Sequence, residues 1–140
     1  MTRKMHRLIT ILLAGIVGLA PLSGQTVPKE LAEAIAAGDA ERMADFFHES
    51  LEMTILQKDH MSSKNQAVRI MESFFKENKP SGFTVSFEGT KEKSKYAIGS
   101  LATDKGAFRV NLFFLNKGDK RLIYYLSIEK ESQYELHPRP

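Results

Sequence analysis

The stretch Ala107–Leu115, Ala-Phe-Arg-Val-Asn-Leu-Phe-Phe-Leu, decides the fold. In a β-strand successive side chains point to opposite faces of the sheet. A strand over this stretch would have one fully apolar face, formed by Phe108, Val110, Leu112 and Phe114. Its other face would be mixed, formed by Arg109, Asn111, Phe113 and Leu115. We therefore expect a strand in the middle of a sheet, with an apolar inner face that other elements must cover.

The next strand, Arg121–Glu129, also alternates and predicts a hairpin with the first. A three-residue loop at Lys117–Asp119 would set Phe114 opposite Leu122, and the pairing would then place the apolar side chains of both strands on the inner face. The residues of the second strand expected to face inward are Leu122, Tyr124, Leu126 and Ile128. Those expected to face outward are Ile123, Tyr125 and Ser127.

Two strands are predicted before this hairpin, at Phe83–Gly89 and Tyr96–Thr103. In the first, alternation places Phe83, Val85 and Phe87 inward. Between the second strand and Ala107–Leu115, a three-residue loop ending in Gly106 would direct Tyr96, Ile98, Ser100 and Ala102 inward. A two-residue loop would invert the strand, and both alternatives stay open.

Three helices are expected in the first part of the chain, at Pro28–Ala37, Asp39–Ser50 and Ser63–Lys79. Gly38 can end the first helix and Asp39 can cap the second. The third begins with the capping-box spacing of Ser63 and Gln66. Its apolar stripe makes it the natural cover for the sheet, with Ala67, Ile70, Met71, Phe74 and Phe75 on one side. Between the second and third helices, we expect a short strand at Leu51–Gln57 and a polar connection at Lys58–Ser62.

The N-terminus has the pattern of a secretory signal peptide, with a basic start, the apolar run Leu8–Ala20 and small residues up to Gly24. The run is too short for a transmembrane helix, which needs about 20 apolar residues. We expect a signal peptide at 1–24, one α+β domain at 25–130 and a polar tail at 131–140. The protein would be exported, to the periplasm or outside the cell, with no membrane association after cleavage. A retained membrane anchor is the alternative.

Charge and cysteine content exclude several functions. The chain has 20 Lys and Arg against 17 Asp and Glu, and three of the basic residues lie in the signal segment, so the remainder is formally neutral. A neutral chain without a basic block gives no electrostatic footprint for nucleic acid. The chain has no cysteine, which excludes disulfides, thiol catalysis and thiolate metal sites.

Several segments of the chain resemble a known family. The chain is similar in its local sequence to a family of small exported Bacteroidota proteins with a domain of unknown function. The segments that carry this resemblance are Lys29–Ile35, Gly38–Glu41, Ala44–Phe47, Phe74–Phe75, Lys79–Val85, Lys95–Gly99 and Leu126–Lys130. The order of the predicted elements resembles that of the nuclear transport factor two-like superfamily, which includes this family. The resemblance implies a cone-shaped α+β, cystatin-like fold, with three N-terminal helices on a curved antiparallel sheet. It implies no reaction, because superfamily members include both enzymes and non-catalytic binding domains.

An inner cavity of this cone is the first candidate site. The predicted register would place Tyr96, Ser100 and Tyr124 on its wall, around a small apolar ligand. The alternative is that both tyrosines pack in the core with their hydroxyls at its edge. No cofactor is expected.

A catalytic site is the second candidate, in which Asp45 or His48 would act as a proton shuttle of an isomerase or dehydratase with Tyr96 or Tyr124. A solvated Asp45 and a His48 that interacts with a helix dipole are the simpler interpretations. Histidine spacing does not suggest a metal site. We therefore expect a non-catalytic domain that binds a small molecule or a protein, with the enzyme as the alternative.

The outer face of the sheet is the third candidate, because apolar residues gather where water is expected. The superfamily often dimerises through this surface, which predicts an isologous homodimer or a partner contact. The residues assigned to this contact are Arg109, Asn111, Phe113, Leu115, Ile123 and Tyr125. Burial of the patch by the C-terminal tail is the alternative.

Overall fold

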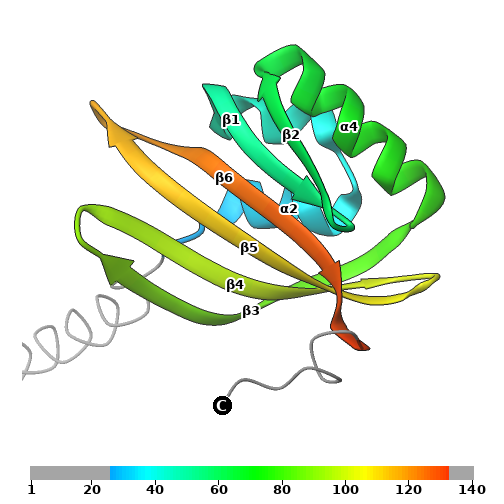
Figure 1. The fold of residues 1–140 in the computed structure, drawn as a ribbon. Helices are drawn as coiled ribbons and strands as arrows, with labels where there is room; N and C mark the ends of the chain where they lie inside the picture. Colours follow the sequence, from blue (N-terminus) through cyan, green and yellow to red (C-terminus); the bar gives the residue numbers. More distant parts are fainter. Residues whose placement is uncertain (1–25, 133–140) are drawn as a thin grey trace, which may run out of the picture.

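In the computed structural model, residues 26–132 are described, and they form three helices and a curved sheet (Figure 1). The predicted signal segment and the tail from residue 133 lie outside this range. The elements are α2 (Lys29–Ala37), α3 (Ala40–Met43), the 3₁₀ turn η2 (Ala44–Phe46), β1 (Phe47–Ile55), β2 (Lys58–Ser63), α4 (Lys64–Glu77), β3 (Pro80–Lys91), β4 (Ser94–Thr103), β5 (Gly106–Lys117) and β6 (Lys120–Lys130).

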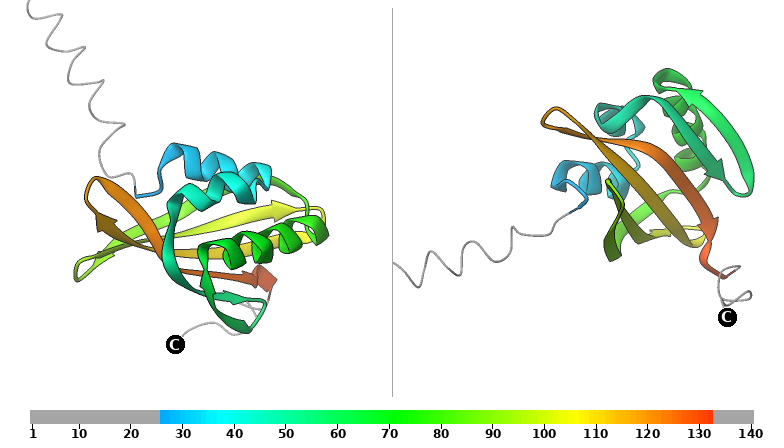
Figure 2. Two further views of the ribbon diagram at one scale, coloured as in Figure 1. Left: turned by 90° about the horizontal axis from the view of Figure 1, so that it is seen from above. Right: turned by 60° about the vertical axis from the view of Figure 1, so that its left-hand side comes forward.

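The six strands form one sheet in the order β2-β1-β6-β5-β4-β3. Strands β3 to β6 are an antiparallel meander, whereas β1 pairs parallel to β6 and antiparallel to β2. The helices gather on one face of this sheet, as the two views of Figure 2 show. The predicted α+β architecture is therefore confirmed.

The inner face of β5 is buried as predicted. Phe108, Val110, Leu112 and Phe114 are each at most 2% exposed. Helix α4 covers this face, and the rings of Phe74 and Phe108 meet edge to face with centroids 5.1 Å apart. Such burial removes apolar surface from water, which is the main favourable term in folding.

The predicted helix signals around the core are confirmed. Gly38 adopts the left-handed conformation that ends α2, and Asp39 accepts a hydrogen bond from the Arg42 backbone N–H at 3.1 Å. At the start of α4, Ser63 and Gln66 form the full capping box.

The second helix is shorter than expected, because β1 begins at Phe47. Phe47 pairs with Ile123 on β6, and both side chains are fully buried. Met43, Phe46 and Phe47 have the spacing of a helix, but Phe47 forms a strand because it pairs with β6. His48 consequently lies in a strand, and its predicted place at a helix end is wrong.

The segment predicted as a polar connection, Lys58–Ser62, belongs instead to β2. The tight turn before it uses Leu56 and Gln57, both with positive φ (50° and 74°). Such turns ordinarily carry Asn or Gly, so nothing in the sequence signalled the hairpin.

The register of β4 is the inverse of the one expected from a three-residue loop. Thr103 pairs with Gly106, so the loop has only two residues. The end of α4 holds this turn, because Asp104 Oδ1 accepts from the Lys79 N–H at 2.9 Å and Lys105 Nζ donates to the Glu77 carbonyl at 2.6 Å. The buried Ala97 and Leu101 face inward, and Tyr96, Ile98 and Ser100 face outward.

The β5–β6 hairpin differs from expectation in a similar way. Lys117 pairs with Lys120, which leaves a two-residue loop, and β6 then bulges at Tyr124, because Phe113 pairs with Tyr125 and Phe114 with Ile123. Ile123 therefore faces inward with 0% exposure, in place of Leu122 and Tyr124. Beyond the bulge, Leu126 and Ile128 face inward as predicted. Each pairs with a β5 residue two positions later in the sequence than the expected partner.

Strand β3 carries a further bulge between Val85 and Phe87. Phe83 and Val85 pack against the core as predicted. Because the bulge reverses the alternation, Phe87 faces outward and is 53% exposed, so its predicted inward position is wrong.

Candidate functional site

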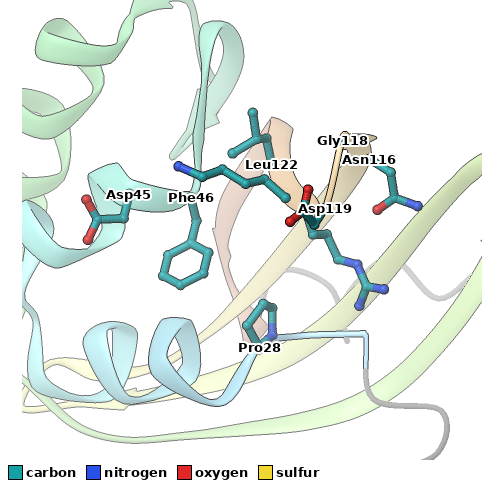
Figure 3. Close-up of a pocket in the computed structure, with 9 residues that line it drawn as sticks. Pro28, Asp45, Phe46, Asn116, Gly118, Asp119 and Leu122 are labelled. Carbon is teal, nitrogen blue, oxygen red and sulfur yellow. The ribbon is translucent and has the colours of Figure 1, made fainter.

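An open cleft of about 850 Å³ lies between the start of α2, the turn η2 and the β5–β6 hairpin (Figure 3). Its apolar part comes from three half-buried side chains, Pro28, Phe46 and Leu122. The polar side chains that line it are Asp45, Asn116, Asp119, Lys120 and Arg121, and Gly118 contributes backbone. Clefts of this size, with apolar walls and a few polar groups, are typical of small-ligand sites.

Asp45 is exposed at one side of this cleft. Figure 3 shows its carboxylate on the far side of Phe46 from the hairpin residues Asn116 and Asp119. Asp45 also borders a smaller hollow with Glu30 and Arg42. A carboxylate so placed is accessible to a charged ligand but is not enclosed as a buried general base would be.

Arg121 is held in place on the hairpin side. Its Nη1 donates to the Thr26 carbonyl at 2.8 Å, and Thr26 is itself 5% exposed. This bond ties the first described residues to β6. The guanidinium therefore has a defined orientation at the edge of the cleft.

His48 lies outside the cleft. Its Nδ1 lies 3.2 Å from the Ser50 carbonyl oxygen and 3.3 Å from the Ser50 backbone nitrogen. Within residues 26–132, no group of three or more His, Cys, Asp or Glu side chains is placed to hold a metal ion. None of the helices in the described part of the chain is long and apolar enough to cross a bilayer.

The outer face of the sheet carries five aromatic rings in mutual contact, which we call the outer aromatic cluster. Ring centroids are 5.9 Å apart for Phe87 and Tyr96, and 5.4 Å for the stacked pair Tyr96 and Phe113. Phe113 also meets Tyr124 at 6.2 Å and Tyr125 at 5.7 Å. Rings at such separations attract one another by about 0.5–1.5 kcal/mol beyond their area burial.

Local backbone features build this cluster. The bulge in β3 directs Phe87 outward, and the bulge in β6 brings Tyr124 beside Tyr125. Gly89 makes room for the Tyr96 ring, since a Cβ at this glycine would lie 2.7 Å from it. The Tyr124 hydroxyl is 2.9 Å from Ser94 Oγ, which links β6 to β4 across β5.

A polar region adjoins the cluster on the same face, toward β1 and β2. Asn111 donates to Ser127 Oγ at 2.8 Å, and Thr54 donates to Asp59 at 2.9 Å. Burial raises the pKa of Glu129, and nearby Asp59 raises it further, whereas a hydrogen bond from the Gln57 backbone lowers it. Glu129 sits opposite Arg109 in the register.

Several residues that were predicted to form sites lie elsewhere in the structure. Tyr96, Ser100 and Tyr124 were expected around an inner pocket, but none of them lines the cleft, and Tyr96 and Tyr124 belong to the outer aromatic cluster. Ile123 was expected on the outer face and is in the core. Arg109, Asn111, Phe113 and Tyr125 do lie on the outer face, together with Leu115 at 38% exposure.

A family model for a domain of unknown function, DUF4783, matches residues 28–129. The chain belongs to the DUF4783 family. A DUF4783 protein from Bacteroides ovatus, known from a crystal structure, has 31% sequence identity to this chain. The two structures match with a TM-score of 0.72, over 76% of this chain and 97% of that one. A DUF4783 protein from Bacteroides fragilis is 32% identical, with a TM-score of 0.71, over 74% and 98% of the two chains.

More distant structures share the fold of this DUF4783 chain. An NTF2-like protein of unknown function from Cytophaga hutchinsonii matches with a TM-score of 0.53 and 8% identity, over 77% of this chain and 89% of that one. At this identity the likeness shows the fold alone. No curated protein matches the chain.

Sequence reasoning missed Phe87, Tyr96 and Tyr124 as members of the outer aromatic cluster. One local signal was present, because a glycine inside a strand often marks a bulge or a close approach. Gly89 is such a residue in this DUF4783 domain, and it lies opposite Tyr96. The positions of the bulges in β3 and β6 had no local signal in the sequence, because they arise from pairing with β4 and β5.

Proposed function

We propose that this DUF4783 domain is an exported, non-catalytic interaction domain, and that the outer aromatic cluster is its contact surface. The observation that carries this proposal is the gathering of five rings on a face that no helix within residues 26–132 covers, with Phe87 53% exposed. Aromatic side chains are enriched at the cores of protein interfaces. The N-terminal signal pattern supports export.

The partner that we propose is a second copy of the chain. In a two-fold interface the same patch meets itself, so each apolar cluster would cover the other. The acidic residues of this face lie to one side, on β1, β2 and β6: Glu52, Asp59 and Glu129. A two-fold axis through Phe113 would hold the two acidic groups apart, which avoids like-charge repulsion.

The catalytic alternative is not favoured, because its groups do not converge. Asp45 lies on η2 beside the cleft, whereas Tyr96 and Tyr124 lie on the outer face of the sheet. The His48 ring contacts the backbone of Ser50, with Nδ1 3.2 Å from the carbonyl oxygen. An acid, a base and a hydroxyl must lie within hydrogen-bond reach of one substrate to act together.

Sedimentation velocity over micromolar concentrations tests the proposal on the mature protein. We expect a reversible dimer, and we expect Phe113→Ser to weaken it at least about tenfold, as for a central interface aromatic. Met61→Ser is the matched control on the same face, because Met61 is 71% exposed on β2 and lies two strands from Tyr125, outside the cluster. Circular dichroism would verify that both variants are folded.

Two results would overturn the homodimer. The first is a wild-type chain that stays monomeric at every concentration. The second is a folded Phe113→Ser variant that associates as strongly as wild type. Equal loss in Met61→Ser would show that the whole face, and not the cluster, is responsible.

A further inference from the structure

The cleft beside Phe46 is separate from the outer aromatic cluster, and its two walls differ in charge. The wall formed by α2 and η2 carries Asp45, and Glu30 lies in the adjoining hollow. Arg42 shares that hollow, but its guanidinium pairs with Glu33 at 3.6 Å. This wall therefore presents negative charge to the cleft.

The opposite wall is the β5–β6 hairpin, which carries Lys120, Arg121 and Asp119. Two positive charges and one negative charge leave this wall positive. The bond to the Thr26 carbonyl fixes the orientation of the Arg121 guanidinium at the cleft edge. Lys120 is exposed and adds a second, adaptable cation.

Between the two walls lie the apolar side chains Phe46, Pro28 and Leu122. Figure 3 shows the Phe46 ring between Asp45 on one side and the hairpin on the other. Phe46 is half-buried, so its remaining surface faces the cleft. A ligand that covers this ring would remove apolar surface from water on both partners.

We propose that this cleft binds a short apolar peptide with free ends. The peptide ammonium would face Asp45, its carboxylate would face Lys120 and Arg121, and an apolar side chain would cover Phe46. A ligand of this kind matches the opposed charges and the apolar middle of the site at once. The volume of about 850 Å³ accommodates a molecule of several tens of atoms.

Isothermal titration calorimetry on the mature protein tests this proposal with the dipeptide leucyl-leucine. Its N-acetylated and C-amidated forms each remove one terminal charge. We expect the free dipeptide to bind and each blocked form to bind at least about tenfold more weakly, since each loses one charge pair.

Two variants test which residue contacts each end of the dipeptide. Asp45→Asn is expected to weaken the free dipeptide while leaving the acetylated form unchanged, and Lys120→Gln is expected to do the same for the amidated form. Glu72→Gln is the matched control, because Glu72 is exposed on α4 and does not line the cleft. We expect it to bind like wild type.

The proposal is overturned if leucyl-leucine gives no binding, or if both blocked forms bind as well as the free dipeptide. Equal weakening by Glu72→Gln would also overturn it, because the effect would then come from net charge. These outcomes are independent of the homodimer, which sedimentation measures without any ligand.

Discussion

The two faces of β5 come from alternate residues of one strand and have different fates. On the inner face, Phe108 lies under α4 and is 1% exposed. On the outer face, Phe113 contacts the rings of three tyrosines on neighbouring strands, with Tyr96 stacked on it at 5.4 Å. The comparison teaches that a helical cover, and not residue type, decides which aromatic residues stabilise the fold and which remain available for contact.

The first prediction compares these two phenylalanines directly. Phe108→Ala should lower the free energy of unfolding by about 3–5 kcal/mol, the usual cost of emptying a buried aromatic site. Phe113→Ala should cost less, about 1–3 kcal/mol in the monomer, because it loses three ring contacts of about 0.5–1.5 kcal/mol each but its side chain is only half-buried. Urea denaturation at a concentration where the chain is monomeric measures both. Equal losses would contradict the separation of the two faces.

The second prediction compares two glycines. At Gly99, an added Cβ would lie 2.6 Å from the inner Phe83 ring and 2.9 Å from the Thr84 carbonyl oxygen. Gly99→Ala should therefore cost about 1–3 kcal/mol through overpacking. At Gly89 the obstacle is the outer Tyr96 ring, which can move toward water, so Gly89→Ala should cost less than about 1 kcal/mol.

Thermal unfolding of the two alanine variants gives the comparison, with Gly82→Ala as a control. A Cβ at Gly82 meets nothing within 4 Å. If Gly89→Ala were the more damaging variant, the outer aromatic cluster would be part of the rigid core. The two faces would then differ less than we conclude.

The third and smallest effect concerns Glu129, in the polar region of the outer face. Burial raises the pKa of this carboxyl above 4.5, with Asp59 on β2 acting in the same direction and the Gln57 backbone N–H opposing. Arg109 on β5 also lies opposite it. Because the pKa is higher in the folded state, protonation of Glu129 favours folding. The stability gained from this proton is fully present below the unfolded pKa and is lost as pH rises through the folded pKa.

Glu129→Gln should therefore gain stability relative to wild type as the pH rises from about 3 to about 7. Urea midpoints of both proteins across this range provide the measurement, with Glu72→Gln as the exposed control. A stability difference that falls with rising pH would show that Arg109 dominates the environment of this carboxylate.

Much of the inner face was predictable because its signals are local. The alternation from Phe108 to Phe114 and the helical spacing from Ala67 to Phe75 each fall within one element. The residues predicted to be buried on β5 and the capping box of α4 are confirmed. The order of helices and strands also followed from these local patterns, apart from β2.

The outer face was harder to predict because it depends on pairing between strands. The turn at Asp104–Lys105 is held by the end of α4, and this distant contact sets the facing of Tyr96. The hairpin at Leu56–Gln57 carries no usual turn residues. The cleft also joins residues that are far apart in sequence, from Pro28 to Leu122.

By itself, the sequence determined the apolar strand at Ala107–Leu115, the helix that covers it and the α+β architecture, because periodicity within an element depends only on neighbouring residues. The tertiary structure alone decided which rings share the outer face and which charges border the cleft. The physical reason is that one bulge or a loop shorter by one residue reverses every side chain of a strand, and contacts with distant elements select between those registers.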